Sequence, residues 1–509
     1  MKRGFLFLMA MVLMSFVACS NDDEMEDLSP KAVNTYMQIQ LTGDELMPSR
    51  TLPQDGNVEP GTLEETKISN LLVLIYDEEG VLKKTFVTEV MKNTNDGAQT
   101  AIIPMGVGRY QVYVVANFSD KEAAWADQMG FDVKQAQIEG ITKKMMVNYY
   151  AADHRFIMFN QCNGVDKTAG VPIDIAVAND YQNPATCVVR LDRLAVKIQS
   201  KLADLNIDKV KTEVGADFID VGVRLKGFKL LNGATKVNLQ QCWTHKLSTV
   251  YPYENMLVTP WLMEEDSLFS YYGKYADFRT IRYNEQGGYI YVRDNYSKMD
   301  FYSGVADGPI YCMENNPCWD GTSVVDAMRG NTTGLVYQFL LEYKGSDELA
   351  GESCFYGYGG KFFPSLAKIQ ETYPNVFDKA DLKSTDKAVD LAAAQAELKA
   401  LYAQEDIYDG VAEFRGKYQV KVYMDGLMYY IHYIKDKNYE DSEKNYYAVM
   451  RNTIYDLTVK QLLRVGEDIP GGWNPDAKPY DPVDPTNTYM NVTVKVNPWV
   501  MNSEDIVLK

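Results

Sequence analysis

The sequence predicts a mainly β protein with more than one domain. Its 36 Tyr and 19 Phe, together with many short β-branched runs, suit strands better than helical bundles. Alternating or continuous apolar segments recur along the chain, and turn-forming residues separate them. A length of 509 residues with 46% hydrophobic content is enough for about two to four domains with buried cores. These numbers exclude a disordered chain.

The charge and the histidine content exclude several functions. With 51 basic and 70 acidic residues, the net charge of −19 repels nucleic-acid phosphates and anionic membrane surfaces. Only His154, His245 and His432 are present, and their spacing fits neither a zinc site nor a nucleophile relay. We therefore expect no enzyme, no catalytic residue, no metal ligand and no cofactor.

The N-terminus resembles an export signal. Lys2 and Arg3 precede an apolar run of 15 residues that ends at Ala18, whereas a membrane-spanning helix needs about 20. Cys19 follows Ala18, as in bacterial lipoprotein signals. We expect residues 1–19 to be a signal peptide with Cys19 as the lipid site. Ordinary secretion is the alternative.

An acidic tether and a first strand follow in residues 20–50. The alternation in residues 36–41 places Met37, Ile39 and Leu41 on one face of a half-buried strand. A loop rich in Gly and Pro comes next and contains Arg50 before Thr51. A basic residue in such a loop is a typical site of proteolysis.

Two β-sandwiches are expected, over residues 51–185 and 186–469. The first contains strands near 68–76, 108–117, 173–177 and 185–200, with a more helical stretch over 118–146. The second contains strands near 218–231, 335–343, 418–424 and 446–459. Aromatic-rich insertions over 261–311 and 355–360 interrupt it, as does an amphipathic helix within 384–404.

The C-terminal region has two parts. Five prolines make residues 470–486 an extended, semi-stiff spacer. Residues 487–509 then resume strict alternation, and we expect this spacer to let the terminal strand leave its own domain. The apolar side chains expected on one face of this strand are Met490, Val492, Val494 and Val496, with Trp499 beyond them.

Six cysteines remain after Cys19, an even number that permits three disulfides in an exported protein. Cys312 and Cys318 are close enough in sequence to close a small loop, so they are the expected pair. Buried free thiols are the alternative for the others.

Eight segments, in this order, resemble the Bacteroidales fimbrillin family of type V pilus subunits, and most closely its short-fimbria shaft-subunit branch. The resemblance covers nearly the whole chain. The segments are Ala18-Cys19, Asn70-Leu71-Leu72-Val73-Leu74-Ile75-Tyr76, Tyr110-Gln111-Val112-Tyr113-Val114-Val115-Ala116-Asn117, Arg190-Leu191-Asp192-Arg193-Leu194-Ala195-Val196-Lys197-Ile198, Met313-Glu314-Asn315-Asn316, Met424-Asp425-Gly426-Leu427-Met428-Tyr429-Tyr430, Arg451-Asn452-Thr453-Ile454-Tyr455-Asp456-Leu457 and Val496-Asn497-Pro498-Trp499.

The resemblance implies two tandem transthyretin-like β-sandwiches and a lipoprotein precursor at the cell outer membrane. It also implies cleavage between Arg50 and Thr51, loss of the first strand, and polymerisation by donor-strand exchange into an extracellular fimbrium. The implied partners are other copies of the chain, accessory fimbrial subunits and a host or bacterial surface receptor. Membrane contact is then limited to the lipid of the precursor.

The residues support strand exchange independently. Loss of the first strand would leave an apolar groove with unpaired ladder edges, which another strand must fill. Residues 34–41 align with residues 487–494, so that Met37, Ile39 and Leu41 correspond to Met490, Val492 and Val494. The terminal strand is therefore the expected donor. A tail already seated within its own chain would argue against this hypothesis.

Two alternatives have different structural consequences. A monomeric surface lipoprotein could bind glycans through the aromatic clusters near residues 269–302 and 354–363, although we favour ordinary core and strand packing for these residues. A tip or anchor subunit of a fimbria is the second alternative. The basic cleavage site together with the long terminal strand favours a shaft subunit.

Overall fold

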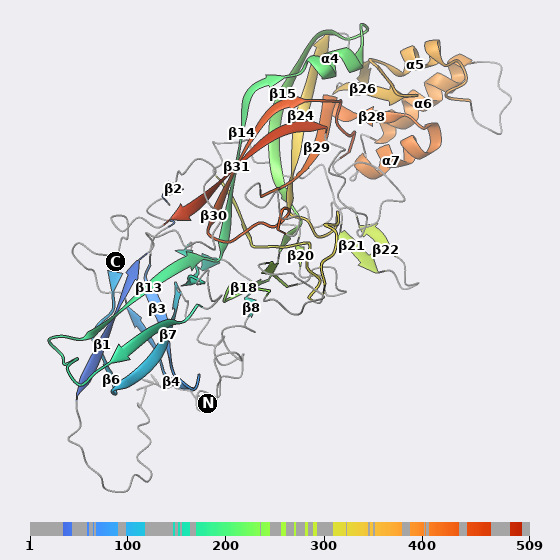
Figure 1. Ribbon diagram of the computed structural model, residues 1–509. Helices are drawn as coiled ribbons and strands as arrows, with labels where there is room; N and C mark the ends of the chain where they lie inside the picture. The colour runs from blue at the N-terminus through green and yellow to red at the C-terminus, as the bar shows by residue number, and fades with distance from the viewer. Residues whose placement is uncertain are drawn as a thin grey trace, which may run out of the picture.

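The structure is a computed structural model, and most of its described residues lie in strands (Figure 1). The nine-stranded first sheet lies at one end of an elongated molecule, and helices α5 to α7 lie at the other (Figure 1). The described residues are 34–42, 59–60, 65, 68–89, 98–117, 146–147, 151–152, 155–162, 169–234, 236–244, 256–260, 269–270, 280–283, 289–292, 309–321, 323–344, 347–349, 352–378, 387–401, 403, 407–436, 445–469 and 489–500.

The first sheet surrounds one core. Side chains from β1, β3, β7, β12 and β13 meet in this core, so the strands enclose it. The main path runs β4 (Leu82–Glu89), β3 (Asn70–Asp77), β7 (Gly108–Ala116), β11 (Met158–Asn160), β13 (Ala185–Arg193), β1 (Thr35–Thr42) and β5 (Ala98–Gln99), with β12 (Val171–Ile175) on β7 and β6 (Ile103–Met105) on β1.

Strand β3 confirms the expectation from its continuous apolar run. Leu71, Val73 and Ile75 enter the core of the first sheet, whereas Leu72 and Leu74 enter a second cluster on the opposite face. Both faces are covered, so every residue from Leu71 to Tyr76 is buried. A strand buried on both faces cannot alternate polar with apolar residues.

The second region is a pair of facing sheets. Side chains of β14, β23 and β30 pack against those of β15, β24 and β29 in one core. The first of these sheets runs β2 (Glu59–Pro60), β31 (Met490–Val500), β30 (Thr453–Leu462), β14 (Ala195–Asn206) and β23 (Ile310–Met313); the second runs β15 (Ile219–Leu231), β24 (Gly334–Lys344) and β29 (Leu427–Tyr433). The mainly β class is confirmed, while the transthyretin-like detail stays a prediction.

An inserted layer covers the outer face of β24 and β29. Its strands are β25 (Asp347–Leu349), β26 (Glu352–Tyr358), β27 (Lys361–Phe363) and β28 (Lys421–Tyr423), and its helices are α5 (Leu366–Thr372), α6 (Lys387–Leu401) and α7 (Ile407–Tyr418). Helix α6 confirms the predicted amphipathic helix, since Ala394 and Leu398 are fully buried in the core under this layer.

Short elements complete the fold. Helix α4 (Asp208–Val214) follows β14, and the 3₁₀ turn η4 (Met424–Gly426) precedes β29. The two-stranded pairs are β8 (Met146–Val147) with β17 (Val237–Asn238), β9 (Ala151–Ala152) with β10 (Arg155–Phe156), β16 (Gly233–Ala234) with β20 (Phe269–Ser270), β18 (Cys242–Trp243) with β19 (Leu257–Val258), and β21 (Thr280–Tyr283) with β22 (Tyr289–Val292).

The two regions share one almost continuous strand. β13 pairs with β1 and β11 in the first sheet, and β14 begins two residues after β13 ends and pairs with β23 and β30. The change of sheet therefore comes at Leu194 rather than at the expected boundary between residues 185 and 186.

The expected disulfide between Cys312 and Cys318 is not formed. Both residues are buried free thiols that belong to different hydrophobic clusters. Burial raises the pKa of both thiols, that of Cys318 to about 12. Cys187 is a buried free thiol as well. Proximity in sequence did not decide the pairing, because β23 carries Cys312 into the main core.

Several predicted features lie outside the described residues. They are the signal peptide with Cys19, the Arg50–Thr51 cleavage site, the spacer over residues 470–486 and the more helical stretch over 118–145. Among the described helices, none combines the length and the apolar character needed to cross a bilayer.

Candidate functional site

Strand β1 is an interior strand of the first sheet. It pairs parallel with β13 from Met37 opposite Ala185 to Thr42 opposite Arg190. Its other edge pairs antiparallel with β5 and β6. The N-terminal segment thus has a neighbour on both sides, and removing it would open two ladder edges in the middle of the sheet.

The inner face of β1 confirms the expected alternation. Met37, Ile39 and Leu41 are each 0% exposed and contribute to the core of the first sheet. Gln38 and Gln40, on the other face, are partly exposed. Burying the three apolar side chains contributes roughly 5–9 kcal/mol before ordering costs, at about 1.5–3 kcal/mol each.

Polar contacts hold β1 beyond the regular ladders. The Ile39 amide donates to the Thr100 hydroxyl at 3.1 Å, and the Ile39 carbonyl accepts from the Thr100 amide at 2.9 Å. At the start of the strand, the Thr35 hydroxyl donates to the Met105 carbonyl, and the Tyr36 amide donates to the Asn179 carbonyl at 2.8 Å. The strand is therefore held at its start and its centre.

Cys187 lies beside β1, on the neighbouring strand β13. It stands opposite Ile39 in the parallel ladder, and its side chain is only 2% exposed. Burial raises the pKa of the Cys187 thiol to about 12. Because β1 helps to cover this thiol, its reactivity reports whether the groove is occupied.

The C-terminal strand β31 does not project from its own domain, contrary to our expectation, and this seated tail counts against the strand-exchange hypothesis. It pairs antiparallel with β30, from Met490 opposite Leu462 to Pro498 opposite Thr453. Met490 is 5% exposed, and the partly buried Val492 packs against the core of the second region. The alternating face that we assigned to a donor therefore also suits the edge of β30. The side chains of Val494, Val496 and Trp499 lie outside the described part of the structure.

A short strand covers the far end of β31. Glu59 and Pro60 of β2 pair parallel with Trp499 and Val500. Among the described residues, β31 has this two-residue partner on one edge and β30 along the other. β2 belongs to the segment that follows the expected cleavage site, so it would stay with the subunit after cleavage.

Glu65 anchors that segment at the junction of the two regions. Its carboxylate lies 2.8 Å from the Lys197 ammonium and accepts from the Tyr311 hydroxyl at 2.6 Å. Its carbonyl accepts from Arg193 Nε at 2.9 Å, and Arg193 also donates to the Asn452 amide oxygen at 2.9 Å. Burial lowers the pKa of Arg193, whereas the charge of Glu65 opposes that shift.

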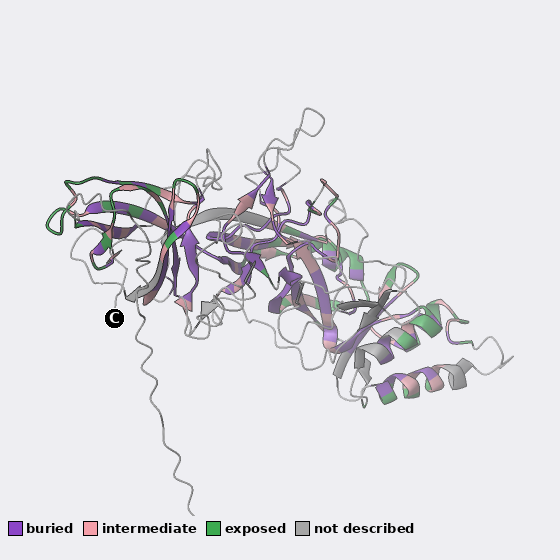
Figure 2. Ribbon diagram, turned by 90° about the horizontal axis from the view of Figure 1, so that it is seen from below, coloured by how far each residue is buried: buried purple, intermediate pink, exposed green. Residues whose placement is uncertain are grey.

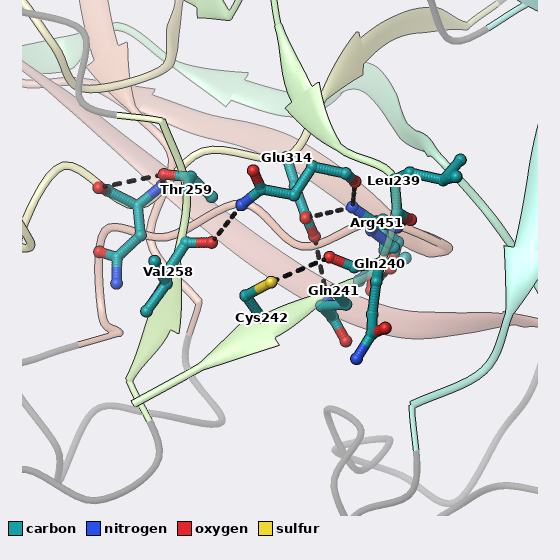
Figure 3. Close-up of polar contacts among 11 residues, drawn as sticks. Leu239, Gln240, Gln241, Cys242, Val258, Thr259, Glu314 and Arg451 are labelled. Carbon is teal, nitrogen blue, oxygen red and sulfur yellow. Dashed lines mark hydrogen bonds and ion pairs between the residues drawn. The ribbon is translucent and has the colours of Figure 1, made fainter. Parts of the chain in front are cut away.

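A second buried ion pair joins Arg451 and Glu314 (Figure 3). The two side chains are 2.5 Å apart and are 2% and 0% exposed. Arg451 also donates to the carbonyl groups of Leu239 and Asn238, and Glu314 accepts from Gln241 at 3.0 Å. These contacts link the segment 238–241 to the residue after β23 and to the turn before β30, so the network has a structural role.

The motifs that carried the resemblance converge at this junction. Asn452 adopts φ of +53° and links Asp192 and Arg193 to the start of β30. Near β29, Gly426 has φ of +72°, and a Cβ there would meet the Leu341 carbonyl at 2.7 Å. Asn and Gly are the residues that tolerate such φ values. These motifs therefore build the frame between the regions.

Comparison with known proteins agrees with this architecture. Residues 41–173 match the family described as major fimbrial subunit protein (FimA), and residues 421–505 match the C-terminal fimbrillin family of the type IV major fimbrial subunit protein. Two separate parts of the chain therefore match models of fimbrial subunit families. The match supports a structural fimbrial subunit at the cell surface, and the proteins of this family are structural rather than enzymatic.

Several solved structures of bacterial proteins are similar to this chain. A candidate cell adhesion protein from Bacteroides eggerthii has 14% identity and a TM-score of 0.40, with 92% of this chain and 97% of that chain covered. One from Parabacteroides distasonis has 14% identity, a TM-score of 0.43 and coverage of 92% and 100%. The tip fimbrial protein Mfa3 from Porphyromonas gingivalis, truncated at its C-terminus, has 11% identity, a TM-score of 0.32 and coverage of 92% and 100%. No curated protein sequence matches the chain.

The structure describes only part of the two aromatic clusters, near residues 269–302 and 354–363. Phe355 and Tyr356 are 0% exposed, and the Phe355 ring stacks on Tyr423 at a centroid distance of 4.1 Å. These two rings are core residues and cannot stack on a sugar. The side chains of the cluster near residues 269–302 lie outside the described part. Among described residues, no group of His, Cys, Asp and Glu is placed to hold a metal ion.

Sequence reasoning found the strand but missed the junction. Of the groove residues, Met37, Ile39 and Leu41 were predicted from alternation, whereas Cys187 was not singled out. Glu65 carried no signal either, because its partner Lys197 is 132 residues away. The only available signal for the junction was the occurrence of charged residues within otherwise apolar strands, as at Arg193 and Lys197.

Proposed function

We propose that this chain is the shaft subunit of a short surface fimbria of Bacteroidales and that it polymerises by donor-strand exchange. It is exported as a lipoprotein on Cys19 and matured by cleavage between Arg50 and Thr51. The mature subunit joins other copies and accessory subunits in an extracellular fimbrium that supports adhesion to a host or bacterial surface receptor.

The single observation that carries the proposal is the position of β1. It lies inside the first sheet with both edges paired and three side chains fully buried, yet it is joined to the rest of the chain only through the segment that contains Arg50. Cutting that segment removes the covalent connection of β1 to its own groove. Another strand can then replace it without competing against an intramolecular link.

The donor is β31 of another copy. If Met490 takes the place of Met37, it stands opposite Ala185, and Val492 and Val494 stand opposite Cys187 and Val189. The apolar residues then fall on the face that β1 now buries. Addition of an extended strand to a sheet uses main-chain hydrogen bonds for affinity and alternate side-chain pockets for specificity.

The pairing of β31 with β30 adds a step to the exchange. The donor has to leave its own sheet before it can enter the neighbouring subunit. It gives up one long ladder and gains two, because the groove offers β13 on one side and β5 with β6 on the other. Repeated head-to-tail, this contact yields a filament, since nothing closes it into a ring.

The deciding experiment is assembly after cleavage. Residues 20–509 are treated with an arginine-specific protease and analysed for SDS-resistant ladders on a gel. We expect ladders from the cut chain and none from the uncut chain. A control that ends before Thr486 lacks the donor and should stay monomeric.

A matched variant separates assembly from folding. Val492→Asp combined with Val494→Asp should abolish the ladders while the subunit keeps its far-UV spectrum, because Val492 is only partly buried in its own sheet. Ladders from the truncated control would remove β31 as the donor. A cut chain that stays single at high concentration, with β31 still on β30, would contradict polymerisation altogether.

A further inference from the structure

The end of the first sheet carries a solvent-exposed apolar surface around the start of β1. Among the described residues, six large apolar side chains are exposed, and Val107, Val177 and Tyr181 are three of them, at 53%, 63% and 58%. They lie in two turns, 106–107 between β6 and β7 and 176–184 between β12 and β13. In Figure 2 these turns at the end of the molecule are coloured as exposed.

The two turns flank the first residues of β1. On one side, the Thr35 hydroxyl donates to Met105. On the other, the Tyr36 amide donates to Asn179, and the Tyr36 ring lies 5.4 Å from the Tyr181 ring in an edge-to-face contact. Any chain that enters the groove in the place of β1 has to pass between these turns. We call Val107, Val177 and Tyr181 the groove mouth.

An open pocket of about 440 Å³ adjoins the groove mouth. Met105 and Val107 line it together with residues of the β3–β4 turn. Its lining carries three acidic and three basic residues, and two ion pairs lie among them: Lys83 is 2.6 Å from Asp77 and Arg109 is 3.5 Å from Glu78. The pocket therefore suits a compact, nearly neutral segment better than a strongly charged one.

We propose that the groove mouth and this pocket bind the proline-rich segment, residues 478–486, of a second copy of the chain. This inference rests on the proposed strand exchange. In the register that places Met490 at Met37, Tyr489 takes the place of Tyr36 and its ring reaches Tyr181. The residues before Thr488 then emerge between the two turns.

The chemistry of that segment fits the surface. Residues 478–486 read Lys-Pro-Tyr-Asp-Pro-Val-Asp-Pro-Thr, with Pro and Val side chains for the exposed apolar groups and a net charge of −1. Polyproline geometry spans about 3 Å per residue and is already stiff, so little conformational entropy is lost when it docks. The spacer thus adds contact area to each interface between neighbouring subunits of the filament.

Peptide competition tests the proposal on the full chain. Two peptides, residues 478–500 and residues 486–500, are added to residues 20–509 during arginine-specific cleavage, and the concentration that halves ladder formation is measured for each. We expect the longer peptide to act at about tenfold lower concentration, which corresponds to ~1.4 kcal/mol. A peptide with residues 478–485 scrambled should behave as the short one.

Substitutions in the chain test whether the groove mouth is the surface that binds the proline-rich segment. In the chain carrying Val107→Asp and Tyr181→Ala, we expect the two peptides to inhibit equally, whereas Ile219→Asp, at a site 59% exposed in the second region, should keep the tenfold difference. Equal inhibition of the unmodified chain, or a scrambled peptide as potent as the natural one, would overturn this inference and leave strand exchange intact. A difference that survives in the Val107 and Tyr181 variant would also overturn it. Inhibition by neither peptide would refute strand exchange itself.

Discussion

The same short sequence, Asn-Thr-Tyr-Met, leads into strands β1 and β31 at residues 34–37 and 487–490, but the two strands have different neighbours in the structure. β1 is paired on both edges, and its three inner side chains are completely buried. β31 is paired with β30 along one edge and, among the described residues, with two residues of β2 on the other. Its Val492 is only partly buried. Similar alternation thus leads to one strongly held strand and one weakly held strand.

The difference bears on the proposed strand exchange. A strand with two ladders and a full core does not leave spontaneously, so the proposal requires that the covalent link of β1 be cut before a competitor replaces it. A strand on one ladder near the edge of a sheet dissociates at a lower free-energy cost. In the proposed exchange, the gain in burial on moving from the environment of β31 to that of β1 is the driving force.

The largest expected effect is on the free energy of unfolding, which should respond differently to substitutions in β1 and in β31. Ile39→Asp places a carboxyl group in a fully buried position and removes an apolar side chain, so we expect a loss of about 4–5 kcal/mol in the free energy of unfolding. Val492→Asp, in β31, should cost less than about 1 kcal/mol. Urea denaturation of the uncut chain measures both. Equal losses would show that the two strands are held alike.

The next largest effect is on the reactivity of Cys187. Under β1 its pKa is about 12, and in an empty groove we expect it to fall toward the ordinary value of 9.0. At pH 8 the thiolate fraction then rises about a thousandfold, and the alkylation rate follows it. Cut monomer kept below the assembly concentration is labelled and mapped by mass spectrometry. The uncut chain and the filament should both stay unlabelled at Cys187.

The pH dependence gives a further check on that groove. In the cut monomer the labelling rate should rise about tenfold per pH unit up to about pH 9, because the thiol is the protonated form and loses its proton as the pH increases. The uncut chain should still react negligibly at pH 9. Rapid labelling of the uncut chain would mean that β1 leaves its groove without cleavage.

The smallest expected effect concerns the anchor of β2. Glu65→Gln keeps hydrogen-bonding groups for Tyr311 but removes the charge that faces the buried Lys197, at a cost of about 2 kcal/mol. Hydrogen exchange at the β31 amides should become faster, while exchange in β1 should not change. Combining Glu65→Leu with Lys197→Met should restore only part of the stability, since Lys197 is then no longer an unpaired charge but the buried Arg193 has lost the compensating charge of Glu65. Faster exchange in β1 as well would show that the junction supports both strands.

Much of the fold could be predicted from local patterns. The apolar run of β3, the alternation of β1 and the helical spacing of α6 each specify an element together with the faces that it buries. The inner face of the groove followed from the same alternation. The predictions of a Cys312–Cys318 disulfide and of a projecting tail were wrong. Both features depend on which part of the folded protein packs next to these residues, and the neighbouring residues in the sequence do not determine that.

The sequence by itself determined where strands form and which of their side chains are apolar, since a period of two residues is a local property of the chain. Only the tertiary structure decided that β1 lies between two neighbours and β31 beside one, that Cys187 lies opposite Ile39 in the ladder, and that Glu65 meets Lys197. Those relations join residues far apart in the sequence, and at that distance pairing is chosen by the competition among all available edges and cores.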